Sequence, residues 1–533
     1  MKMKKALLLT AFILLIGTLF VSCDYKHEHK DGKWIIDKEA TEQEEGLKHQ
    51  ICSICKENIR EVTIPVISCF KYTVNPDAET CTISGINDFP GTELYIPEYL
   101  GKYKVTAIGD SAFNNYDHFA SVTISDGVTS IGDHAFYRCS SIANLIIPNS
   151  VTSIGAESFA YCNNLASVTI PAFAISYIPT SELQNVIITS GTSIDNYAFR
   201  NCTRLTSIVL PDSITSIGVS AFADCAFLNS ITIPGSVKSI GSYAFRDCTR
   251  LTNIIIPDSV TIIGANAFSD CTGLASIVIP DSITSINDYT FNGCKNLKSI
   301  VIPDSATSIG EFAFFNCSSL TDIVIPDSIT SIGNYAFGKC NALKSIALSN
   351  SVTSIGHSVF MDCTRLTNIV LPNNITSISS SMFKNCKNLK SIAIPNSVTR
   401  IGSGAFENCN NLTGIVIPDN VTEIGAHAFK NCKSLTIIVL PEGITSIAIS
   451  TFEGCSYLEE IVIPESVTSI RNYAFYISGI MTVYYAGTSE MWAAITISSY
   501  NSVINSKICY YSETQPTIAG NYWHYVNSIP TKW

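Results

Sequence analysis

This 533-residue chain has few charged side chains and few histidines, and it lacks common catalytic motifs. Charged residues make up 14%, the net charge is −11, and no run of Lys and Arg follows the first five residues. Nucleic-acid binding needs clustered cations that neutralise phosphates, so we expect no nucleic-acid partner. No G-x-S-x-G, H-E-x-x-H or P-loop motif occurs, and the eight histidines do not gather on one face of the repeat described below. We therefore expect no enzyme.

Long apolar runs are also missing, except for one near the N-terminus. "MKMKK" is basic, and "ALLLTAFILLIGTLF" is apolar but short for a membrane span, a combination typical of an export signal. Ser22 and Cys23 follow and resemble a bacterial lipobox, although Phe20 stands where Leu, Val or Ile is usual. We expect residues 1–22 to be a lipoprotein-type signal peptide. Lipidated Cys23 would then anchor the exported protein to a membrane, at the outer membrane or cell surface; the alternative is ordinary secretion.

Phenylalanine recurs with a fixed period along most of the chain. Every step is 23 residues except the step from Phe159 to Phe199, which spans 40 residues and contains a short divergent unit, residues 171–193. A fixed period of 20–29 residues is typical of leucine-rich-repeat solenoids. The sixteen phased positions are 113, 136, 159, 199, 222, 245, 268, 291, 314, 337, 360, 383, 406, 429, 452 and 475.

One repeat unit contains two short runs with strand chemistry. In "LTSIVLP" (residues 205–211) apolar side chains alternate with small polar ones, and Pro211 suits a corner because it has no N–H to donate. In "ITSIG" (residues 214–218) Gly218 turns the chain out of the second run. "VSAFADC" (residues 219–225) places Phe222 and Cys225 three positions apart, which predicts a short helix.

A single coil of this kind cannot bury its apolar face, but stacked coils can. We therefore predict a β-rich leucine-rich-repeat solenoid of about sixteen 23-residue coils, each with two short strands and a short helix. The repeats would span residues 113–480, between an N-terminal cap at 70–112 and an aromatic-rich C-terminal cap at 481–533. Residues 23–69 lack the period and form a separate charged segment with a CxxC pair.

The repeat "LTSIVLPDSITSIGVSAFADC" (residues 205–225) resembles the BspA-like, or treponemal-type, leucine-rich repeat of bacterial surface proteins. The flanking segments at residues 72–113 and "VYYAGTSEMWAAI" resemble the caps of that family. The resemblance implies a surface protein that attaches to host proteins, to tissue or to other bacteria. A fold hosts many functions, so the resemblance implies the fold more strongly than any one ligand.

Fourteen of the twenty cysteines share one repeat position, three residues after the Phe. An exported protein with many cysteines usually contains disulfides. In a stacked array, however, neighbouring side chains of one column point the same way, so we expect buried free thiols that act as small apolar groups. The fourteen positions are 139, 162 and every 23rd residue from 202 to 455.

Two groups of residues raise the question of a bound metal. Cys52 and Cys55 form half of a zinc site, with a disulfide or an inert remnant as the alternatives. Asp or Asn usually follows the corner proline, and stacking would place these residues in a row. Their preference for turns explains the row, and the alternative is that Ca²⁺ bridges the stacked carboxylates. The Ser after it would bond the backbone at the corner. The row contains Asp212, Asp258, Asp281, Asp304, Asp327, Asn350, Asn373, Asn396 and Asp419.

The outward positions of the first strands are candidate ligand contacts, represented by Asn253, Ile255, Ser276, Val278, Ser299 and Val301. Such a uniform surface suits long or repetitive macromolecules, although β-branched residues are also simply good strand formers. Trp492 and Trp523 lie in the aromatic C-terminal region and would either contact a ligand or cap the last coil. The sequence thus predicts adhesion to host or bacterial surface macromolecules; the alternatives are a structural envelope scaffold and a glycan-binding module.

Overall fold

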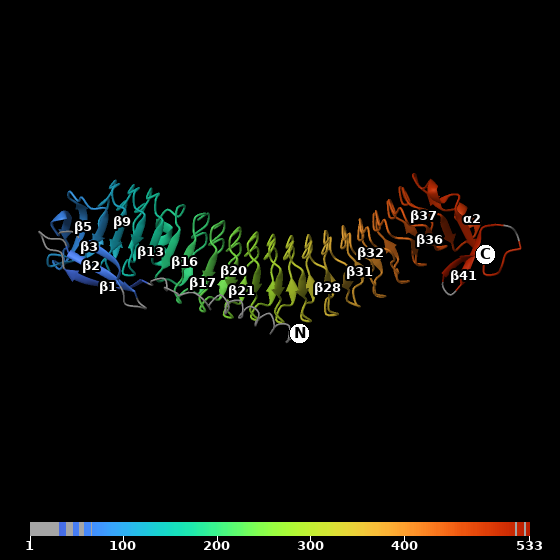
Figure 1. Cartoon of the computed structure of the whole chain (residues 1–533), viewed down its shortest axis with the longest axis horizontal. Coiled ribbons are helices and arrows are strands. Elements are labelled where there is room, and N and C mark those ends of the chain that lie inside the picture. Colours follow the sequence, from blue (N-terminus) through green and yellow to red (C-terminus); the bar gives the residue numbers. More distant parts are fainter. Residues whose placement is uncertain (1–30, 39–45, 53–57, 65–66, 518–519, 527–528) are drawn as a thin grey trace. The chain divides into compact units, whose positions relative to one another are not determined.

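The computed structural model describes residues 31–38, 46–52, 58–64, 67–517, 520–526 and 529–533. The chain divides into two compact units, residues 1–214 and 215–533. Both contain stacked coils whose short strands lie side by side (Figure 1). Cys23 and Cys55 lie outside the described residues.

Unit 1 begins with an antiparallel sheet and continues into parallel coils. In each coil, the first strand precedes the corner and the second strand follows it. The second strands of unit 1 extend the β4–β5 hairpin through β8, β10 and β12, and the first strands form the sheet β6-β9-β11-β13-β14-β16. The strands are β1 (Asp31–Lys38), β2 (Gly46–Cys52), β3 (Asn58–Ile64), β4 (Phe70–Val74), β5 (Thr80–Ile86), β6 (Glu93–Ile96), β7 (Tyr99–Leu100), β8 (Tyr103–Ile108), β9 (Ser121–Ile124), β10 (Ser130–Ile131), β11 (Asn144–Ile146), β12 (Ser153–Ile154), β13 (Ser167–Ile170), β14 (Asn185–Ile188), β15 (Ser193–Ile194) and β16 (Ser207–Val209), with the 3-10 helix η1 (Ile67–Cys69).

Unit 2 repeats the coil with little variation. The first strands are β18 (Ser230–Thr232), β20 (Asn253–Ile255), β22 (Ser276–Val278), β24 (Ser299–Val301), β26 (Asp322–Val324), β28 (Ser345–Ala347), β30 (Asn368–Val370), β34 (Ile437–Val439) and β36 (Glu460–Ile463). The second strands are β17 (Ser216–Ile217), β19 (Ser239–Ile240), β21 (Ile262–Ile263), β23 (Ser285–Ile286), β25 (Ser308–Ile309), β27 (Ser331–Ile332), β29 (Ser354–Ile355), β31 (Ser377–Ile378), β32 (Arg400–Ile401), β33 (Glu423–Ile424), β35 (Ser446–Ile447), β37 (Ser469–Ile470) and β39 (Thr496–Ile497).

The C-terminal end of unit 2 leaves the repeat and turns into mixed structure. Strands β38 (Thr482–Tyr485), β40 (Ile508–Tyr511), β41 (Tyr522–Val526) and β42 (Ile529–Lys532) continue the last first-strand sheet, and β41 and β42 pair antiparallel. The helix α2 (Ser489–Ala493) and the 3-10 helix η3 (Ser502–Ile504) lie between them in the sequence. These elements cover the end of the sheet that the repeats build.

The predicted short helix of each coil is wrong, because these residues form successive hydrogen-bonded turns. In the coil of Phe245, the N–H groups of Tyr243, Phe245 and Asp247 donate to carbonyls of the next coil, at 2.8–3.0 Å. The N–H groups between them donate three residues back within their own coil. Tyr243 and Asp247 have φ of 60° and 57°, a left-handed conformation that an α-helix does not contain. Stacking therefore replaces the helical hydrogen bonds.

The corner between the two strands follows the sequence prediction. In the coil of Pro257, the N–H of Val260 donates to the Pro257 carbonyl at 3.0 Å and closes a turn in which Asp258 is exposed. The Ser259 hydroxyl donates to the Val237 carbonyl of the preceding coil at 2.6 Å. The serine column therefore satisfies backbone groups at the bend, as the sequence predicts.

Stacked phenylalanines form the centre of the core. Within unit 2, Phe222 and Phe245 have ring centroids 5.3 Å apart with an interplanar angle of 8°, and the same stacking continues as far as Phe475. Gly264, after the second strand of its coil, packs closely on the preceding coil, since a Cβ there would meet the Ser242 nitrogen.

The divergent unit interrupts one sheet and not the other. The 3-10 helix η2 (Ala172–Tyr177) stands where a second strand would be expected, and the sheet of second strands ends at β12. The first strands β13 and β14 still pair in register, from Ser167 opposite Asn185 to Ile170 opposite Ile188. The core of unit 1 therefore stays continuous across the break.

Candidate functional site

The first strands present two columns of side chains to solvent, as the sequence predicts. Asn253 and Ile255 flank the buried Ile254 in β20, and Ile255 is 57% exposed. The parallel register places Ile255 opposite Val278 and Val278 opposite Val301, while Ser276 lies opposite Ser299. The structure thus brings all six predicted strand residues onto one face. We call the column that contains Ile255 the apolar strand column.

The apolar strand column continues well beyond the predicted residues. The exposure of its side chains varies: Val278 and Val301 are half-buried, whereas other members are exposed to solvent. These β-branched side chains, with Ala347 and Ala393 between some of them, follow one line along the coils, which is the kind of surface a macromolecular partner buries. The most exposed members in unit 2 are Ile255 at 57%, Val324 at 49%, Val370 at 61%, Val416 at 81% and Val439 at 43%.

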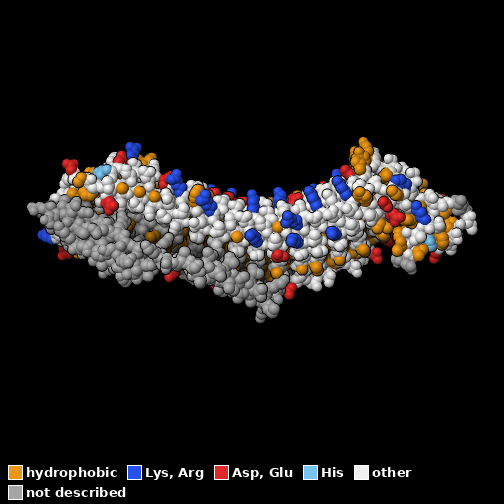
Figure 2. All heavy atoms as spheres, viewed as in Figure 1, with side chains coloured by type: hydrophobic (Ala, Val, Ile, Leu, Met, Phe, Trp, Pro, Cys, Tyr) orange, Lys and Arg blue, Asp and Glu red, His pale blue; other side chains and the backbone are white. Residues whose placement is uncertain are grey.

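A basic surface that the sequence argument missed lies over the middle coils of unit 2. Figure 2 shows Lys and Arg side chains gathered there, with few acidic side chains among them. Lys298, Lys344 and Lys390 hold one repeat position on alternate coils, 46 residues apart. A search for runs of consecutive basic residues cannot find such a cluster, but the phase of the repeat can.

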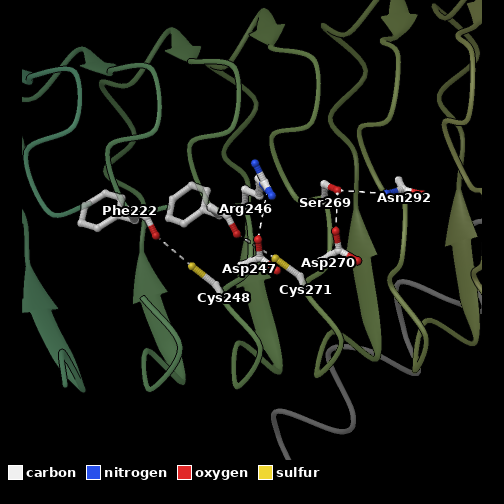
Figure 3. A network of polar contacts seen from close by, with 9 residues as sticks. Phe222, Arg246, Asp247, Cys248, Ser269, Asp270, Cys271 and Asn292 are labelled. Atoms are coloured by element: carbon white, nitrogen blue, oxygen red, sulfur yellow. Dashed lines mark hydrogen bonds and ion pairs between the residues drawn. The ribbon is translucent and has the colours of Figure 1, made fainter. Parts of the chain in front are cut away.

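The cysteine column is buried, and its thiols are free in every described coil. Each thiol also has a polar partner: Cys248 donates to the Phe222 carbonyl at 3.2 Å, and Cys271 to the Phe245 carbonyl at 3.0 Å (Figure 3). Burial raises the pKa of the Cys340 thiol to about 12, so thiolate chemistry is suppressed. The column is structural, and its weak S–H donor adds to the apolar role predicted from the sequence.

A second column, mostly of Asp, Asn and Gly, lies one residue before the cysteines, and Arg138, Tyr161 and Lys339 are its exceptions. Asp247 pairs with Arg246 at 3.0 Å, the Ser269 hydroxyl donates to Asp270 at 3.1 Å, and Asn292 donates to Ser269 at 3.1 Å (Figure 3). Burial and the neighbouring Asp270 carboxylate raise the pKa of Asp247. This position has positive φ, so the choice of residue reflects backbone conformation.

Trp492 and Trp523 are buried in the C-terminal cap, at 8% and 1% exposure. The Trp523 indole N–H donates to the Tyr485 carbonyl at 2.9 Å, and Trp492 packs edge-on against the Tyr485 ring at 5.0 Å. Trp523 is enclosed by the cap, whereas Trp492 packs in the cap and also lines a hollow of about 470 Å³. The geometry supports the capping alternative for both residues.

The metal predictions gain no geometric support within the described residues. No group of three or more His, Cys, Asp and Glu side chains there could hold an ion. Asp258, Asp281, Asp304 and Asp327 are all exposed at their corners. Cys52 ends β2, and its partner Cys55 falls outside the described residues. Zinc at Cys52 and Cys55, and Ca²⁺ along the corner row, remain predictions.

The divergent unit of unit 1 contains a cavity of about 390 Å³. Asn149 bridges to the hydroxyls of Thr189 and Ser190 at 2.6 and 2.7 Å, and Asp195 accepts a hydrogen bond from Ser193 at 2.8 Å. Asp195 is the one carboxylate in the lining, and no histidine or cysteine lines the cavity with it. The lining therefore offers no pair of groups for acid–base or nucleophilic chemistry.

Comparisons with known proteins agree with this architecture. A leucine-rich repeat protein from Bacteroides ovatus ATCC 8483 is 26% identical, covering 83% of this chain and 98% of its own, with a TM-score of 0.53. A leucine rich cell surface protein from Faecalibacterium prausnitzii A2-165 is also 26% identical, covering 80% and 96%, but superposes with a TM-score of only 0.31. No curated protein matches the chain. No helix in the described residues is long and apolar enough to cross a membrane.

A match to a sequence family assigns the repeats to a known class. A family described as "BspA type Leucine rich repeat region" matches residues 92–190, 179–298, 284–413 and 377–492, which together cover most of the chain. The resemblance noted from the repeat is thereby confirmed. The chain belongs to the BspA-type leucine-rich-repeat proteins.

Proposed function

We propose that this protein is a non-catalytic surface protein that binds macromolecules of a host or of other bacteria through its apolar strand column, and so acts in adhesion. The observation that carries the proposal is the row of mostly β-branched side chains at one position of the coils, which includes Val370 at 61% and Val416 at 81% exposure and is interrupted by Ala347 and Ala393. Isolated exposed apolar residues are ordinary, whereas apolar residues that recur along one line of the surface are typical of an interaction site.

The form of the column suits an extended protein partner. The repeated Ser and Asn side chains beside it, such as Asn253 and Ser276, can bond a partner's backbone while the apolar column buries its side chains. Few Tyr, Trp or Arg anchors stand among these residues, so we expect many weak contacts distributed over several coils.

Binding should be tested with the full-length protein on a panel of immobilised matrix proteins and intact host cells. Replacing Val370 and Val416 with Lys should weaken binding about tenfold per position, because each change places a charge in the buried strip. The matched control replaces Ile262 and Ile449, which are 58% and 47% exposed but lie outside this column. Equal losses in both variants, or no binding across the panel, would reject the proposal.

We also propose that the protein is held at the cell surface by a lipid on Cys23. Support comes from the N-terminal sequence alone: a basic start, a short apolar run, and a small residue before the cysteine. Cys23→Ser should move the protein from the membrane fraction to the medium. In intact cells, a surface adhesin should be cleaved by added protease, whereas a structural scaffold inside the envelope would be protected.

A further inference from the structure

Six lysines line up along the turns between the cysteine column and the first strands of unit 2. They are Lys295, Lys298, Lys344, Lys387, Lys390 and Lys433, and we call them the lysine row. They occur on alternate coils, and the coils between them carry Ser, Thr and Asn at the same two positions, while Arg365 lies next to one of these positions. All six side chains are exposed.

Backbone hydrogen bonds fix the position of the row. The carbonyls of Lys298, Lys344 and Lys390 accept the N–H groups of Thr321, Thr367 and Thr413 on the following coils, at 3.2, 2.9 and 3.1 Å. Paired parallel strands are about 4.8 Å apart, so equivalent lysines on alternate coils lie about 10 Å apart. The row therefore presents charge at a regular interval along the stack.

The charge of the row is not neutralised by the protein. None of the six lysines forms an ion pair with any described residue, in contrast to Lys384 and Lys430, which pair with Glu407 and Glu453 at 2.9 and 3.0 Å. Asp322, opposite Ser299, is the carboxylate that lies among them. A protein of net charge −11 thus has an uncompensated basic strip on one face.

A hydroxyl-lined hollow of about 620 Å³ lies within the row, between Lys298 and Arg365. Ser319, Asn341 and Thr364 line it, and their side chains form no hydrogen bond with the described residues. The Ser318 and Thr321 hydroxyls bond only backbone carbonyls, at 3.3 and 3.4 Å, which leaves their lone pairs open to accept. The hollow thus combines two cations with several neutral donors and acceptors.

We propose that the lysine row binds an extended acidic polysaccharide whose carboxylate or sulfate groups recur once per disaccharide. An extended disaccharide spans about the same length as two coils, so acidic sugars would meet lysines while neutral sugars bond the hydroxyls and amides between them. A single-stranded nucleic acid would need aromatic side chains on which bases stack, and the hollow has none. This site adjoins the apolar strand column, because Lys298 directly precedes β24, but it consists of other residues and does not depend on the proposed function.

The proposal can be tested by titrating the full-length protein with chondroitin sulfate at several salt concentrations. Replacing Lys298, Lys344 and Lys390 with Gln should weaken binding on the order of a hundredfold, at roughly tenfold or less for each lost cation. The dependence of log affinity on log salt should fall by roughly one unit per lysine. The matched control replaces the exposed Lys102, Lys238 and Lys532 with Gln, which changes the net charge equally.

Further experiments distinguish recognition of the sugar from general attraction between the lysine row and anions. Asp322→Asn should strengthen binding of chondroitin sulfate, because it removes the carboxylate from the row. Poly(dT) and phosphatidylserine vesicles should bind more weakly than chondroitin sulfate at equal charge. The proposal is overturned if the two triple variants lose affinity equally, or if either of these other anions binds the row more tightly. Circular dichroism and the melting temperature confirm that each variant is folded.

Discussion

The cysteine column should make the solenoid unstable at alkaline pH. The ten thiols from Cys248 to Cys455 in unit 2 all have a pKa raised by burial, to about 12 for Cys340 and Cys455. In the unfolded chain a thiol ionises near its ordinary pKa of 9.0. The folded state therefore keeps protons that the unfolded state loses. Stability is full below pH 9 and falls as the pH rises toward the folded pKa values.

The size of this effect follows from proton linkage. Between pH 8 and pH 10, each buried thiol lowers the free energy of unfolding by about 1.4 kcal/mol, because an unfolded thiol goes from mostly protonated to mostly ionised. If unit 2 unfolds as one body, ten thiols together lower it by on the order of 10 kcal/mol, which is comparable to the total stability of an ordinary domain.

The assay is urea unfolding followed by circular dichroism at pH 8, 9 and 10, with reducing agent present. Replacing Cys271 and Cys294 with Ser provides the control, since serine does not titrate in this range. The double variant should start less stable at pH 8 but lose about 3 kcal/mol less than the native protein on going to pH 10. Unfolding free energies that are equal at pH 8 and pH 10, or a slope that the double variant does not change, would refute the reasoning.

Three further predictions concern the repeat itself. Gly264→Ala should lower the free energy of unfolding by about 1 kcal/mol, because its Cβ would meet the Ser242 nitrogen and the coils must shift to admit it, as they do at Ala448 in the same repeat position. Gly414→Ala meets no atom within 4 Å and should be neutral, and denaturant midpoints compare the two. Ser259→Ala should lower the free energy of unfolding by about 1 kcal/mol, because it removes the hydrogen bond to the Val237 carbonyl. Ser328→Ala should not lower it, because the buried Ser328 hydroxyl has no hydrogen-bond partner among the described residues. Equal losses in the two variants would contradict the assigned role of the serine column. Asp247→Asn should raise the melting temperature at pH 7 and have little effect below pH 3. The raised carboxyl pKa means that ionisation destabilises the folded state, but only once the pH exceeds the ordinary pKa of 3.8. A lower melting temperature at pH 7 would show instead that the ion pair with Arg246 dominates.

The periodic features could be predicted from the sequence because each follows from a local rule repeated every 23 residues. Alternation in "LTSIVLP" predicts that Ile208 is buried and Val209 exposed, and the structure agrees. The shared phase of Phe and Cys predicts their buried columns. Proline followed by Asp and Ser predicts the corner turn, because these residues favour turns in any context.

The remaining features depend on contacts between coils, which one unit does not reveal. Phe222 and Cys225, three residues apart, suggest a helix, but stacking offers alternate N–H groups a carbonyl on the next coil and selects a left-handed turn instead. Lys298 and Lys344 are neighbours only after folding. Trp523 looks available for a ligand in the sequence, and only the cap strands bury it. The Asp, Asn or Gly before most of these cysteines was a signal for the turn, since these residues tolerate positive φ.

The central claim, that partners bind the apolar strand column, is tested most directly by site-specific photo-crosslinking. A photoreactive amino acid would be placed at Val370 in one variant and at Ile262 in another; both positions are strand residues in unit 2, with 61% and 58% exposure. On host cells or a bound matrix protein, crosslinks should form from position 370 and not from position 262. Crosslinks from position 262, or equal yields from both, would contradict the account.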